Sequence, residues 1–110
     1  MFPKKQRIPR EFFKEIMIKG DKKISSFFLL KKRDFHLNLA RFAVIISKKV
    51  EKSAVKRIFL KRKFTNSLQN LIKENKIKIE NLDYIFILSK NIRDKNYDEI
   101  STEIQKTFNL

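Results

Sequence analysis

Eight lysine and arginine side chains lie between positions 48 and 63, with a single acidic residue among them. They are Lys48, Lys49, Lys52, Lys56, Arg57, Lys61, Arg62 and Lys63. Arginine can hold a phosphate through two parallel hydrogen bonds, whereas lysine acts as a point charge. A packed domain keeps so many like charges together most readily when a polyanion neutralises them. The segment therefore predicts a nucleic-acid-binding surface. If about six phosphates are neutralised, the log–log dependence of affinity on salt should have a slope of about −5.

Side chains that could carry catalysis are scarce. His36, the only histidine, lies in a polar segment without a nearby serine or cysteine partner, which favours an exposed loop histidine. The acids are scattered singly, apart from Asp98-Glu99, which suit the first turn of a helix. The chain has no Gly-rich phosphate loop, and without cysteine it has no disulfide and no thiolate ligand or nucleophile. We expect a binding protein with neither catalytic nor metal-ligating residues of its own.

Length and composition predict one folded domain spanning 1–110, because 42% of the residues are hydrophobic and 35% are charged. The net charge of +15 is uneven: residues 1–80 hold 23 of the 27 Lys and Arg but only 7 of the 12 Asp and Glu. A lysine-rich coding bias would not leave the last thirty residues neutral, so nucleic-acid binding is favoured over a merely solvated surface or an anionic membrane. No apolar run is long enough to span a membrane, and the basic N-terminus lacks the apolar stretch of a signal peptide. We expect a cytoplasmic protein.

The periodicity of apolar residues predicts the order α-β-β-α-β-α. The expected helices cover 10–19, 54–74 and 96–108, and the expected strands cover 24–31, 40–49 and 83–89. Gly20 follows the first expected helix, at the position where a glycine in the left-handed conformation commonly caps a helix. Ser53 and Asn75 should bound the long helix. The second strand is apolar enough for burial on both faces. Because a strand–helix–strand unit normally pairs its strands in parallel, we expect an α+β fold, an α/β two-layer sandwich.

The long helix has one apolar stripe and two basic flanks. Leu60, Phe64, Leu68 and Leu71 share the stripe, which should pack on the sheet. Phe59 lies away from it, among Lys52, Lys56 and Lys63. Two roles are open for Phe59: stacking on an RNA base, or packing with Val55 against a neighbouring element. We favour packing.

The basic segment also resembles a known family. An apolar strand leads into Ser47-Lys48-Lys49-Val50, then Ala54-Val55-Lys56-Arg57 and Lys61-Arg62. Together with Pro3-Lys4-Lys5 near the N-terminus and Asp83-Tyr84-Ile85-Phe86-Ile87 after the helix, these motifs are similar to the protein component of bacterial ribonuclease P. The resemblance covers almost the whole chain. It departs from the family pattern at four positions: Ile58 and Phe59 replace Asn and Arg, Glu51 replaces Gly, and Met17 replaces an aromatic residue.

The resemblance implies a ribosomal protein S5 domain 2-like fold with a central sheet and an unusual left-handed β-α-β crossover, against the general right-handed rule. It also implies a subunit of an endoribonuclease that removes the 5′ leader of precursor tRNA. In that holoenzyme the RNA subunit is the catalyst, and Mg²⁺ is bound mainly by the RNA. The implied partners are the catalytic RNA and precursor tRNA, with no membrane and no protein partner. The basic cluster would hold the catalytic RNA, and Phe13, Phe28 and Lys31 would line a cleft for the leader, although core packing is a strong alternative for the two phenylalanines.

Two other functions fit the charge pattern. One is a general RNA- or ribosome-binding protein of similar architecture. The other is a DNA-binding module that places the basic helix in a major groove, but the helix lacks the Asn or Gln plus Arg positions that would read bases.

Overall fold

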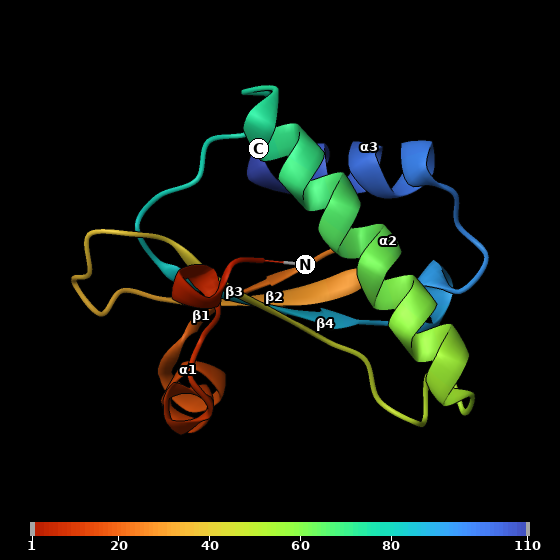
Figure 1. Cartoon of the computed structure of the whole chain (residues 1–110), viewed down its shortest axis with the longest axis horizontal. Coiled ribbons are helices and arrows are strands. Elements are labelled where there is room, and N and C mark those ends of the chain that lie inside the picture. Colours follow the sequence, from red (N-terminus) through yellow and green to blue (C-terminus); the bar gives the residue numbers. More distant parts are fainter. Residues whose placement is uncertain (1, 110) are drawn as a thin grey trace.

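The fold is a four-stranded sheet with two long helices on one face and a short helix on the other (Figure 1). The structure is a computed structural model, and it describes residues 2–109. The helices are α1 (Phe13–Lys19), α2 (Ala54–Lys73) and α3 (Tyr97–Phe108), and the strands are β1 (Asp21–Ile24), β2 (Phe28–Arg33), β3 (Arg41–Ile45) and β4 (Asp83–Leu88). Short 3-10 helices cover Lys4–Gln6 (η1), Arg10–Phe12 (η2) and Lys90–Ile92 (η3).

The strand order is β1-β2-β4-β3. β2 is antiparallel to both β1 and β4, whereas β3 and β4 are parallel and are connected through α2. This confirms the α+β class and the parallel strand–helix–strand unit, while the left-handed crossover stays a prediction. The expected single strand over 24–31 is wrong. A turn, in which Ser25 N donates to Phe28 O at 2.9 Å, divides it into β1 and β2.

β3 lies at an edge of the sheet, and the expected burial on both its faces is confirmed in part. Arg41 and Phe42 are buried. Val44 packs on the α2 side of the sheet and Ala43 and Ile45 pack on the α1 side, but these three are only half-buried. The outer edge of β3 pairs with Arg7 through an isolated bridge at Phe42. The fully enclosed strand is β4, between β2 and β3, where five of six residues are buried.

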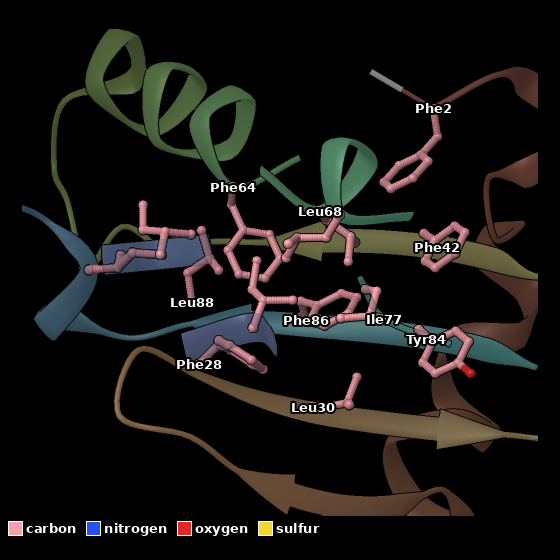
Figure 2. Close-up of a cluster of buried hydrophobic side chains, with 14 of the residues drawn as sticks. Phe2, Phe28, Leu30, Phe42, Phe64, Leu68, Ile77, Tyr84, Phe86 and Leu88 are labelled. Carbon is pink, nitrogen blue, oxygen red and sulfur yellow. The ribbon is translucent and has the colours of Figure 1, made fainter. Parts of the chain in front are cut away.

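Aromatic side chains fill the space between the sheet and α2 (Figure 2). Phe64 of α2 contacts Phe28 of β2 and Phe86 of β4 with ring centroids 5.3 and 5.0 Å apart. The predicted stripe of α2 is confirmed, since Leu60, Phe64, Leu68 and Leu71 are at most 4% exposed. A smaller cluster lies on the opposite face of the sheet around Ile8, Ile16 and Ile85.

Local hydrogen bonds explain where the helices begin and end. Ser53 Oγ accepts from Lys56 N at the start of α2. Asn75 follows its end with φ 57°, and Lys76 N donates to Leu71 O at 3.0 Å, the pattern of a Schellman motif. Asn96 and Glu99 form a reciprocal capping box at α3. Within residues 2–109, no helix is long and apolar enough to cross a membrane.

Gly20 does not form the expected left-handed cap, because its φ is −68° and its ψ is 149°. It is needed instead for a close approach between α1 and β2. A Cβ at this position would stand 2.9 Å from Lys32 O and still closer to Ile16 O.

Gly20→Ala should therefore destabilise the fold by about 2 kcal/mol or more, since both obstructing atoms belong to the backbone and α1 must shift. Urea unfolding measures this cost. Lys19→Ala, at the exposed neighbouring position, is the control and should change the free energy of unfolding by less than about 0.5 kcal/mol. Equal effects of the two substitutions would contradict the close approach.

Candidate nucleic-acid interface

The predicted basic cluster occupies the loop 46–53 and the first three turns of α2. Six of its eight side chains are exposed: Lys48, Lys49, Lys52, Lys56, Lys61 and Arg62. Among the described residues, none of these six forms an ion pair with a carboxylate. Their charges are thus not neutralised by a carboxylate contact, which favours binding of a polyanion.

The other two cations of the cluster are turned toward the protein. Arg57 Nη1 donates to Glu51 O and to Lys52 O, both at 2.9 Å, and so ties the loop to the helix. Lys63 Nζ donates to Lys95 O at 2.9 Å and lies 5.1 Å from the centroid of the Phe59 ring. Both are half-buried, so they position the interface more than they present free charge.

The favoured packing role of Phe59 is wrong. Phe59 is 62% exposed, and its expected partner Val55 is 77% exposed. Ile58, the other departure from the family pattern, is also exposed. The first turns of α2 therefore present apolar and aromatic surface between the lysines.

Grooves run along both sides of this part of α2. Lys61, Arg62 and Ile58 line a groove of about 500 Å³ toward β3, where Arg7 and Phe42 complete it. Lys56 and Phe59 line another, of about 790 Å³, toward the segment that follows β4. The exposed cations are thus distributed over both flanks of the helix.

The segment after β4 adds cations that were not predicted from the sequence. Lys90 and Arg93 line the larger groove, and Arg93 Nε lies 3.6 Å from Glu51 Oε1 in the loop after β3. The carboxyl ends of parallel strands lie at the same edge of a sheet, so the two loops had to meet. This parallel pairing was the signal in the sequence that could have indicated these residues.

The residues predicted for a leader cleft lie on two different faces of the sheet. Phe13 and Lys31 are on the α1 side, half-buried around the cluster of Ile16 and Ile85. Phe28 points to the opposite side, is 2% exposed and contacts Phe64. The prediction that Phe28 lines the leader cleft is therefore wrong, and Phe28 belongs to the core. Successive side chains of β2 point to opposite faces of the sheet, so Phe28 and Lys31 cannot share a face.

A buried ion pair anchors the α1 side of the sheet. Arg41 at the start of β3 donates to both carboxylate oxygens of Asp83 in β4, at 2.8 and 2.6 Å. The Arg41 guanidinium carbon also lies 4.5 Å from the centroid of the Phe12 ring. Arg33 and Glu15 add a more exposed contact between β2 and α1 at 3.2 Å. These contacts fix the position of α1 and the alignment of β3.

His36 and Tyr84 are two further titratable groups among the described residues. His36 is exposed, as predicted, in a loop where its N donates to Asp34 Oδ1 at 2.7 Å. Burial raises the pKa of Tyr84 above its usual 10.0, despite a hydrogen bond from Glu80 N, so this core hydroxyl stays neutral. Within residues 2–109, no group of three or more His, Asp or Glu side chains is placed to hold a metal ion.

Comparisons with known proteins agree with the geometry. The family model for ribonuclease P matches residues 2–110. The fold is similar to the ribonuclease P protein of Staphylococcus aureus (22% identity, 93% of this chain and 91% of that chain, TM-score 0.74). It is also similar to that of Thermotoga maritima (17% identity, 93% and 94%, TM-score 0.80). No curated protein sequence matches the chain. At these identities the solved structures support the fold, and the family model supports the family.

Proposed function

The chain belongs to the ribonuclease P protein family, and we propose that it binds the catalytic RNA of ribonuclease P through the exposed cations of the loop 46–53 and α2. The supporting observation is that six neighbouring cations lie exposed without carboxylate partners in the described part of the chain. Fixed cations that contact phosphates release condensed counterions and reduce repulsion between RNA segments. The protein should therefore lower the concentration of Mg²⁺ that the RNA needs to fold and cleave.

We further propose that the 5′ leader of precursor tRNA lies on the α1 side of the sheet, beside Phe13 and Lys31. Phe13 offers ring surface for stacking, and Lys31 offers charge to the backbone of an unpaired strand. Phe28 is excluded from this role by its burial. Lys22, which pairs with Lys31 in the register of β1 and β2, lies on the same face and is exposed, so it adds a second charge there.

The chain's own contribution is binding and orientation. We assign the Mg²⁺-dependent hydrolysis, which leaves a 5′ phosphate on the mature tRNA, to the RNA subunit. The RNA it binds would place the protein in the cytoplasm.

Reconstitution with a bacterial ribonuclease P RNA tests the proposal. Adding the chain at low Mg²⁺ should restore cleavage of precursor tRNA and tighten its binding. The benefit should grow with leader length up to the span of the surface beside Phe13 and Lys31 and be absent for mature tRNA. If the chain binds this RNA no better than unrelated structured RNAs and restores no cleavage, a general RNA-binding role replaces the proposal.

A further inference from the structure

The groove of about 790 Å³ lies between the first turns of α2 and the segment around η3. Phe59 of α2 and Phe27, just before β2, line it together with Lys56, Lys90 and Asn91. In Figure 1 the yellow-green half of α2 lies beside the light-blue segment that follows β4. The groove thus spans the two loops that leave the parallel strands, and its volume lies within the range of about 300–1,000 Å³ that is usual for small-molecule sites.

Phe59 is the unusual feature of this groove. A phenylalanine that is 62% exposed contributes little to the core, yet it stands among cations on the most basic helix of the chain. Lys63 lies over its ring at 5.1 Å and leaves most of the side chain open. An exposed ring flanked by positive charge is the arrangement that proteins use to stack an unpaired base, with cations for the attached phosphates.

The charges of the groove favour an anionic occupant. Lys56 and Lys90 are exposed, and among the described residues neither pairs with a carboxylate. Two acids also line the groove: Glu51, which is held by Arg93 at 3.6 Å, and Asp94, which is exposed. The cations in the lining outnumber these acids four to two. Lys56 lies on α2 with Phe59, and Lys90 lies on η3.

We propose that this groove binds an unpaired nucleotide of RNA, with the base stacked on Phe59 and the phosphates beside Lys56 and Lys90. The inference rests on the proposed function for the identity of the RNA. Phe59 thus provides a stacking contact at the position where the family pattern has a phosphate-binding arginine. Bases inside a duplex are already stacked on each other, so the site selects a loop, a bulge or a single-stranded joint.

Substitutions should separate the stacking contact from the ionic ones. Phe59→Ala should weaken binding of the RNA about tenfold, the loss of one stacked base, with an unchanged salt slope because no charge is removed. Lys56→Gln should make the slope shallower by about 0.7 to 0.9. Tyr97→Ala, which removes another exposed ring, on α3, is the matched control and should leave affinity unchanged. An unaffected Phe59→Ala variant would overturn the proposal.

A spectroscopic test reports the stack directly. The chain has no tryptophan, so Phe59→Trp introduces a single tryptophan at an exposed position, whose fluorescence can be excited apart from that of tyrosine, and Tyr97→Trp provides its control. A short oligoadenylate should quench the tryptophan fluorescence of the Phe59→Trp variant and leave that of the Tyr97→Trp variant unchanged. Inorganic polyphosphate offers charge without a base and should quench neither. Equal quenching by polyphosphate would show that the groove recognises charge alone, and no quenching by oligoadenylate would contradict the stacked base.

The two proposals fail in different ways. A wild-type chain that does not bind ribonuclease P RNA contradicts the proposed function, while quenching by oligoadenylate would still support the groove. A chain that binds this RNA with full affinity after Phe59→Ala contradicts the groove and leaves the proposed function intact.

Discussion

Replacing Lys48, Lys49, Lys52 and Lys61 by glutamine should weaken binding to ribonuclease P RNA roughly 10³-fold at about 0.1 M salt. Each phosphate contact contributes about 0.7 to 0.9 to the log–log salt slope, so the slope should become shallower by about 3. All four side chains are exposed and form no ion pair within residues 2–109, so the fold should be unaffected. Filter-binding titrations at several salt concentrations measure both quantities.

The chain provides a control with the same change of charge. Four exposed lysines lie at the other end of α2, in the loop after it and near the end of α3: Lys73, Lys76, Lys78 and Lys106. Replacing these four by glutamine also removes four positive charges. These lysines lie farther from the basic cluster than the Debye length, which is about 10 Å at this salt. Binding should weaken less than tenfold. If both variants lose affinity equally, net charge determines binding and the proposed interface is wrong.

The α2 segment was predictable from local sequence because its signals agree with one another. A stripe at helical spacing, a capping Ser53 and a terminating Asn75 all specify the same helix, and the structure confirms each of them. The stripe faces the sheet for the general reason that a helix in a small domain has one core to cover. The basic residues on its flanks followed from the same geometry.

The strands were less predictable because their positions depend on long-range pairing. Residues 27–30 read Phe-Phe-Leu-Leu, so alternation offers no way to tell which side chains face the core. The error at Phe28 follows from this ambiguity. The division between β1 and β2 lacks the Gly or Pro that usually marks a turn, and the edge position of β3 depends on the order of the whole sheet.

The groove at Phe59 could not be predicted from local sequence at all. Its two walls are about thirty residues apart in the chain and meet only because β3 and β4 pair in parallel. The exposure of Phe59 could not be inferred from a helical wheel, which shows that a residue leaves the main stripe but not whether another element covers it. In the structure no element covers Phe59 well enough to bury it, and its ring lies exposed in the groove beside η3.

Asp83→Ala should destabilise the protein by about 3–5 kcal/mol, because it leaves the Arg41 guanidinium buried without its partner. The Asp83 side chain is 1% exposed and that of Arg41 10%, and the two share both hydrogen bonds of a bidentate pair. Arg33–Glu15 is the matched exposed pair, and Glu15→Ala should cost less than about 1 kcal/mol. Chemical denaturation of the two variants measures the difference.

A double variant separates the pair from its surroundings. Replacing Arg41 and Asp83 together by leucine removes the unpaired charge, and the free energy of unfolding should recover most of the loss seen in Asp83→Ala. Arg41 pairs with Asp83 at the start of the parallel ladder, and β3 ends just before the loop that carries Lys48 and Lys49. If the ion pair serves stability alone, the folded double variant should bind RNA like the wild type. If it also sets the register of β3, affinity should fall although the protein remains folded, because a slip of one residue would turn the side chains of β3 to the opposite face and displace the loop.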